Sequence, residues 1–207
     1  MTIKELKSQS GAKYFASVMG KSTINSRSEE YKMIEDAVVE LMKRDFGIIH
    51  GGYAGGAMSA ASEAAANYLQ ENSLPTQRNI GVPQKEHEGL WDRARGAVFT
   101  NVADNLFSRL HMITSGDIAV FAPLGGDGTE VEESIIFHEN IIRGYTNEKP
   151  VSMIFLQTAN GVKWRELISR KIELLDTNIE SIEDLEWLHF VNSVEEFKNL
   201  LSELDLT

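Results

Sequence analysis

The residues of this chain best suited to chemistry form a glycine-rich segment followed by acidic side chains. Gly125, Gly126, Gly128 and Thr129 come soon after an apolar run, and Glu132 follows within one helical turn. Glycines let a backbone approach an anion closely, and a helix N-terminus adds unpaired N–H groups and the positive end of its dipole. We therefore expect a ligand phosphate at this corner, with a carboxylate beside it.

A second glycine-rich corner contains Gly51 and Gly52, between a short apolar run and an alanine-rich segment at 57–69. Neither corner has the spacing of the Walker motif or of the dinucleotide motif G-x-G-x-x-G. A single glycine turn is often only a connector, but two such turns at one sheet edge favour a binding site.

Alternating strands and helices must position these corners. The apolar runs predict strands, and apolar residues recurring every three or four positions predict helices. The predicted strands are 14–19, 48–50, 79–83, 96–101, 117–122, 150–156 and 188–191, and the predicted helices are 29–45, 57–69, 105–112, 131–142, 164–175 and 194–204. This order predicts a Rossmann-like α/β fold, a doubly wound parallel sheet with its ligand crevice beyond the carboxyl ends of the strands.

Composition limits the classes of function. The 207 residues fit one nucleotide-binding domain, 1–207, with 1–12 as a flexible or helical extension. A net charge of −11 argues against nucleic-acid or anionic-membrane partners. Cysteine is absent, and His50, His111 and His138 do not have metal-ligand spacing, so no metal site is expected. Without an apolar signal segment or spanning run, we expect a soluble cytoplasmic protein.

The charged residues near the corner also have structural explanations. The helix dipole favours acidic residues in a first turn, which suits Glu130, Glu132 and Glu133 equally. Arg109 lies on the preceding predicted helix, where an ordinary solvated arginine is an equally simple interpretation. Asp127 would repel an anion in the corner unless its side chain points outward or helps to hold a cation.

The corner resembles a motif of the LONELY GUY family, the cytokinin riboside 5'-monophosphate phosphoribohydrolases, and the resemblance spans almost the whole chain. The family's P-G-G-x-G-T-x-x-E motif is matched from Leu124 to Glu132, with leucine in place of proline. Its upstream glycine motif is met loosely by Gly51, Gly52, Gly56 and Met58, with Tyr53 in place of the third glycine.

The family's M-H-x-R-K helix motif aligns without gaps to residues 106–110. Arg109 therefore falls on the family's catalytic arginine. Phe107 replaces the histidine of the motif and Leu110 its lysine, so this chain departs from the family pattern at two positions close to that arginine.

The resemblance implies hydrolysis of the N-glycosidic bond of a nucleoside 5'-monophosphate to free base and ribose 5-phosphate, without a metal or organic cofactor. Glu132 would stabilise the oxocarbenium-like state and align water, and Arg109 would orient it and the substrate. The resemblance also implies a homodimer. The remaining implied site residues are the phosphate ligands Gly125, Gly126, Gly128 and Thr129 and the pocket wall Gly51 and Gly52.

A non-enzymatic alternative remains open. Molybdenum-cofactor carrier proteins have similar folds and glycine motifs, and they hold a phosphate-bearing pterin. The replacements at Phe107 and Leu110 fit a different base, a larger substrate, or a chain that binds a nucleotide without cleaving it, and the leucine at 124 is a further departure. The retained pair of Arg109 and Glu132 favours hydrolysis, because a carrier does not need that pair.

Overall fold

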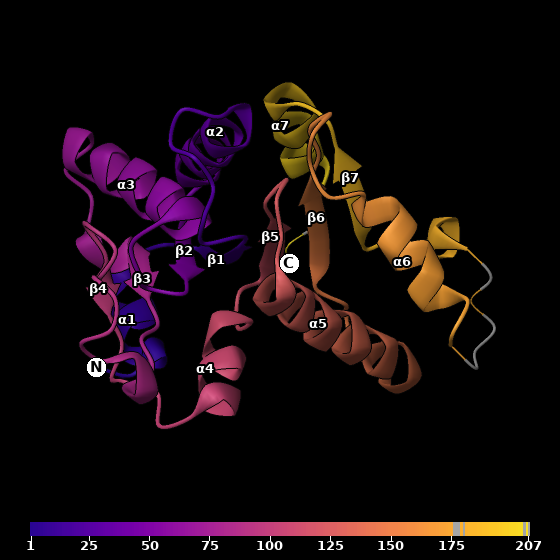
Figure 1. Cartoon of the computed structure of the whole chain (residues 1–207), viewed down its shortest axis with the longest axis horizontal. Helices are drawn as coiled ribbons and strands as arrows, with labels where there is room; N and C mark the ends of the chain where they lie inside the picture. The colour runs from indigo at the N-terminus through magenta and orange to yellow at the C-terminus, as the bar shows by residue number, and fades with distance from the viewer. Residues whose placement is uncertain (176–178, 180, 205, 207) are drawn as a thin grey trace.

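The computed structural model describes residues 1–175, 179, 181–204 and 206. Its strands form one parallel sheet in the order β4-β3-β2-β1-β5-β6-β7 (Figure 1). The strands are β1 (Tyr14–Met19), β2 (Phe46–His50), β3 (Asn79–Gly81), β4 (Val98–Phe99), β5 (Ile118–Phe121), β6 (Ser152–Leu156) and β7 (Leu188–Val191). The order runs outward in both directions from the pair β1 and β5, which is the doubly wound arrangement that the sequence predicts.

Helices lie between most of the successive strands, before β1 and after β7. They are α1 (Ile3–Ser10), α2 (Glu29–Lys43), α3 (Gly56–Glu71), α4 (Leu106–Ile113), α5 (Asp127–Thr146), α6 (Trp164–Ile172) and α7 (Val194–Glu203). Short 3-10 turns lie at Thr76–Arg78, Lys85–His87 and Ile182–Asp184. Ser28 caps α2 as expected, because its side chain accepts a hydrogen bond from the Tyr31 N–H. No helix in the described part of the chain is long and apolar enough to cross a bilayer.

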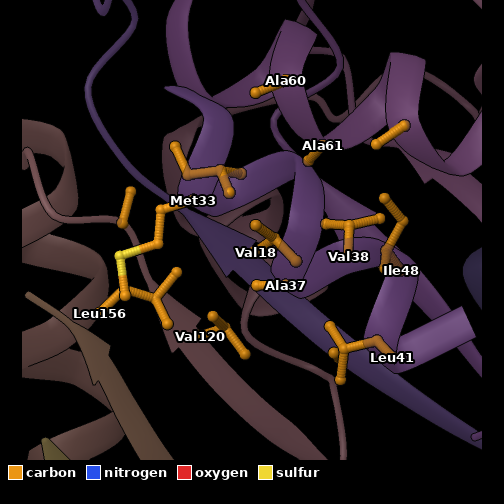
Figure 2. Packing of buried hydrophobic residues seen from close by; sticks show 14 of the residues in the cluster. Val18, Met33, Ala37, Val38, Leu41, Ile48, Ala60, Ala61, Val120 and Leu156 are labelled. Carbon is orange, nitrogen blue, oxygen red and sulfur yellow. The ribbon is translucent and has the colours of Figure 1, made fainter. Parts of the chain in front are cut away.

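The helices cover the two faces of the sheet in separate groups. In Figure 1, α2, α3 and α7 lie on one side, and α4, α5 and α6 on the other. Alternate residues of each strand serve the two faces: Val18 of β1 packs under the first group, whereas its neighbour Met19 packs under the second. Figure 2 shows the first core, in which Met33 of α2 lies against Leu156 of β6. Burial on both faces makes this sheet a rigid base for the loops at its carboxyl edge.

The structure confirms the predicted fold and changes some details. The extension at 1–12 contains a helix whose Leu6 is fully buried. Helix α5 begins at Asp127, so Gly128 and Thr129 belong to its first turn. Val131 and Ile142, the apolar residues at the two ends of the predicted helix 131–142, are 45% and 47% exposed.

Candidate functional site

Three loops meet where the strand order reverses, at the carboxyl ends of β1 and β5. The Lys21 N–H, just after β1, donates to the Leu124 carbonyl at 2.9 Å. The Lys21 carbonyl accepts from the Ala57 N–H at the start of α3, at 3.0 Å. Gly20 makes this approach possible, because a Cβ there would lie 2.4 Å from the Ala122 Cβ. Both glycine-rich corners therefore adjoin the switch point, where open α/β sheets bind their ligands.

Trp164 packs against the corner between β5 and α5, and the N-terminus of α5 at this corner has no side-chain cap. The Trp164 Nε1–H donates to the Ala122 carbonyl at 3.0 Å, and the Trp164 ring packs so tightly on Gly125 that a Cβ there would lie 2.7 Å away. Gly126 caps α5 without a side-chain hydrogen bond. The backbone N–H groups of residues 126–129 donate no hydrogen bond within the described residues. These donors and the helix dipole suit an anion.

Arg109 is fixed beside the same crevice by backbone groups of two loops. Its Nε donates to the Val82 carbonyl at 3.1 Å, and its Nη2 to the Gly51 carbonyl at 3.0 Å. Gly51 must be a glycine for this contact, because a Cβ there would lie 2.7 Å from Arg109 Nη2. Arg109 is partly buried, and burial lowers its pKa, so the interpretation as an ordinary solvated arginine is wrong.

Glu132 lies in the electric field of Arg109. Burial raises the pKa of the Glu132 carboxyl to about 7, although the positive charge of Arg109 acts in the opposite direction. The two side chains, both described, make no direct ion pair, and the Glu132 carboxyl accepts no hydrogen bond from the described residues. A carboxyl group that titrates near neutral pH and has no protein partner is a candidate for chemistry.

The structure separates three acidic residues that were expected together in a first helical turn: α5 begins at Asp127, so of the three only Glu130 lies in that turn. Glu130 is exposed. Glu133 is fully buried and forms an ion pair with Lys171 of α6, so it joins two helices. Only Glu132 interacts with Arg109, which distinguishes it from its two neighbours as the functional candidate.

The other predicted site residues fall at or near this crevice. In the first turn of α5, Thr129 is buried, with 3% of its surface exposed. Its neighbour Gly128 faces open space, because a Cβ there would have no atom within 4 Å. Asp127 is exposed at the start of α5. Gly52, with φ 81°, packs against Val82, since a Cβ there would lie 2.9 Å from the Val82 nitrogen. The crevice thus brings together both glycine-rich corners, Glu132 and Arg109.

His50 is a core residue that supports the second corner. It is fully buried at the end of β2, and its Nδ1 accepts from the Gly52 N–H at 3.1 Å. Its Nε2 lies 3.1 Å from Asn79 Oδ1. Burial lowers the pKa of His50 to about 4, so the ring is neutral at physiological pH. Among the described residues, no group of three or more histidine, aspartate or glutamate side chains could hold a metal ion.

Lys21 is a candidate that the sequence interpretation missed. Its side chain is exposed, and its Cγ lies 3.9 Å from where a Cβ of Gly126 would be. This position places a flexible cation beside the open N-terminus of α5. The sequence did contain a signal: Lys21 follows directly after the first predicted strand and Gly20. Loops that follow strands beside the switch point line the ligand crevice.

Comparison with known proteins supports the fold. No family model matches the chain, and no curated protein matches its sequence. Among solved structures, the molybdenum cofactor binding protein from the phototrophic bacterium Rippkaea orientalis is similar, with a TM-score of 0.64 and 16% identity over 92% of this chain and 96% of that one. The molybdenum cofactor carrier protein MCP from Chlamydomonas reinhardtii has a TM-score of 0.61 and 14% identity, over 92% and 97%. At these identities the likeness shows a shared Rossmann-like fold.

Proposed function

We propose that this protein hydrolyses the N-glycosidic bond of nucleoside 5'-monophosphates, as its resemblance to the LONELY GUY family implies. One observation carries the proposal: Glu132, with a pKa of about 7, lies under the influence of Arg109 and on the helix whose N-terminus at Gly126 is uncapped. A carboxylate, a guanidinium and an anion site at one crevice are the groups that this reaction needs.

The phosphate anchors the substrate in this proposal. The N–H groups of residues 126–129 and the Thr129 hydroxyl hold the 5'-phosphate, and the exposed Lys21 adds positive charge. Asp127 is exposed and turns its charge to solvent. Gly51 and Gly52 form the opposite wall. Binding energy from the phosphate, remote from the reacting bond, then positions the anomeric carbon near Glu132.

The chemical step uses the ionised form of Glu132. As the C1'–N bond breaks, the base leaves with the electron pair and positive charge develops on the ribose ring. The Glu132 carboxylate stabilises this charge and accepts a proton from the water that adds to C1'. Arg109, held by two backbone carbonyls, keeps part of Glu132 ionised at neutral pH and orients the ribose. Glu132 then gives up this proton, which reaches the departing base through water, so the carboxylate is regenerated and the products are free base and ribose 5-phosphate.

A second candidate function is that of a non-catalytic carrier for a nucleotide or the molybdenum cofactor. The observation in its favour is the fold that this chain shares with two molybdenum-cofactor-binding proteins over 92% of its length. The uncapped start of α5 would hold the phosphate of either ligand. A carrier gives no role to the Glu132–Arg109 interaction, so a variant of Glu132 separates the two candidates.

The test is incubation of the pure protein with a panel of nucleoside 5'-monophosphates, followed by chromatography of the released base. We expect release by the unmodified protein and loss of release in Glu132→Gln. Glu186→Gln is the matched control, because Glu186 is an exposed glutamate in the loop before β7, outside α4 and α5. Release that is unchanged in Glu132→Gln would refute the assigned mechanism, and tight binding without any release would favour the carrier.

We further propose that the protein is a homodimer. Helices α4 and α5 expose large apolar side chains, with Phe107 82% and Tyr145 72% exposed. A hollow between the two helices is lined by His111 and Ile142, among others. A second hollow lies along α5 from Asp127 to His138 and does not include Glu132 or Arg109. Large apolar side chains exposed on two helices beside a hollow favour a protein interface.

Substitution of Phe107 tests the homodimer. Phe107→Asp should convert a dimer to a monomer in analytical ultracentrifugation, because it places a charge in the buried apolar surface. Leu174→Asp is the matched control, since Leu174 is 86% exposed and lies just beyond α6, outside α4 and α5. A monomeric unmodified protein would contradict the homodimer.

A further inference from the structure

The loop between β3 and β4 carries side chains that the proposed reaction does not use. Their centre is Tyr53, from the second glycine-rich corner. The rings of His87 and Trp91 lie 5.6 Å and 5.5 Å from the Tyr53 ring, and 4.3 Å from each other. The Arg93 guanidinium lies 5.5 Å from the Tyr53 ring, and the Tyr53 hydroxyl donates to the Gln84 carbonyl at 3.1 Å. We call Gln84, His87, Trp91 and Arg93 the loop cluster.

The loop cluster adjoins the candidate site. The Arg109 guanidinium lies 5.6 Å from the Tyr53 ring, on which the loop cluster is assembled. Burial and the charge of Arg109 lower the pKa of His87, so His87 is close enough to sense that guanidinium. A ligand whose ribose lies at Arg109 would therefore have the loop cluster within reach of its next group, the heterocycle.

Three buried polar atoms of the loop cluster have no partner within the described residues. Gln84 is 1% exposed, and its Nε2 donates to Glu86 Oε2 at 2.7 Å, which leaves Oε1 as an acceptor without a donor. His87 Nδ1 and Arg93 Nη1 are likewise buried and unpartnered. Buried polar atoms nearly always have hydrogen-bond partners, because an unmet one is costly. Three unpartnered polar atoms around a single tyrosine indicate a binding site in which a polar ligand supplies the missing hydrogen bonds.

We propose that the loop cluster recognises the heterocycle of the ligand through a 2-amino-4-oxo-pyrimidine edge. Gln84 Oε1 accepts from the amino or ring N–H groups of that edge, and Arg93 Nη1 donates to its carbonyl oxygen. His87 and Trp91 supply aromatic surface for the ring. Guanine and pterins share this edge, whereas adenine has no carbonyl and no ring N–H on the corresponding face. The proposal rests on the proposed function for the position of the phosphate.

The test is binding to the Glu132→Gln protein, which leaves the ligand intact. Calorimetry compares GMP, AMP, ribose 5-phosphate and 6-hydroxymethylpterin. We expect GMP to bind roughly tenfold or more tightly than AMP, because AMP leaves buried polar atoms unmet. Adding Gln84→Met should lower GMP affinity by about tenfold and leave ribose 5-phosphate affinity unchanged. Lys85→Met is the matched control, since the neighbouring Lys85 is exposed.

The outcomes separate this proposal from the proposed function. Equal affinity for GMP and AMP, or an equal loss of GMP and ribose 5-phosphate affinity in Gln84→Met, would overturn the edge recognition and leave the phosphate site standing. If neither GMP nor ribose 5-phosphate binds, the proposed function fails. In that case the affinity for 6-hydroxymethylpterin tests the loop cluster. If the protein binds 6-hydroxymethylpterin and Gln84→Met weakens this binding, the loop cluster recognises a pterin. If 6-hydroxymethylpterin does not bind, the proposed edge recognition is overturned.

Discussion

Replacing Glu132 by glutamine should make the protein more stable at alkaline pH. The carboxyl pKa of Glu132 rises from 4.5 to about 7 on folding, mainly because the group is buried. The folded state therefore binds the proton more tightly than the unfolded state does. Ionised Glu132 thus destabilises the fold, and this penalty is absent below about pH 4.5, grows between about pH 4.5 and 7, and is complete above about pH 7.

The size of the effect follows from that pKa. At about 1.4 kcal/mol for each pH unit, the move from 4.5 to about 7 corresponds to a penalty of about 3 kcal/mol. Glutamine has nearly the same shape and cannot ionise. We expect Glu132→Gln to raise the free energy of unfolding by up to about 3 kcal/mol at about pH 8, and by close to zero at about pH 4.5.

Urea unfolding at a series of pH values measures this difference. Subtracting the curve of the unmodified protein removes the contributions of the other titrating groups, which both proteins share. Glu186→Gln, at an exposed position in the loop before β7, controls for the loss of one negative charge from a chain of net charge −11. A stability difference that does not depend on pH, or a less stable Glu132→Gln at about pH 8, would refute the reasoning.

Three further predictions follow from the site. Arg109→Met should raise the pKa of Glu132 further, because the positive charge of Arg109 lowers it. The acidic limb of the kcat/KM profile should then move to higher pH. An unshifted limb would contradict the interaction between Arg109 and Glu132. Gly51→Ala should lower the hydrolysis rate by tenfold or more, since its Cβ would displace Arg109, and by urea unfolding it should be less stable than Gly128→Ala, whose Cβ has open space. Burial lowers the pKa of His50 to about 4, so the folded state disfavours its charged form. The free energy of unfolding should therefore fall by up to about 3 kcal/mol as the pH falls from about 6.5 toward 4. Urea unfolding of His50→Gln should lack this loss.

Local patterns were enough to predict the fold and part of the site. The strands and helices follow from apolar periodicity, and Glu132 follows from its spacing after the glycines, because both depend on residues near in sequence. Arg109 was harder to interpret. Its burial depends on the carbonyls of Val82 and Gly51, which lie far from it along the chain, and the alignment to a family motif was the only signal.

Other features could not be predicted from the chain. The periodicity of α5 is the same for a side chain in the core and for one on an unpaired apolar face, so the spacing does not reveal that Val131 and Ile142 are exposed. The segment from Gln84 to Arg93 has no repeating pattern, because Tyr53 assembles it from a different loop. Lys21 reaches the crevice only because β1 and β5 are neighbours in the sheet.

Release of free base from a nucleoside 5'-monophosphate tests the central claim most directly. We predict that the unmodified protein yields free base and ribose 5-phosphate in equal amounts, and that Glu132→Gln binds the nucleotide but releases no base. Binding of the nucleotides with no base released by the unmodified protein from any member of the panel would contradict the claim of hydrolysis.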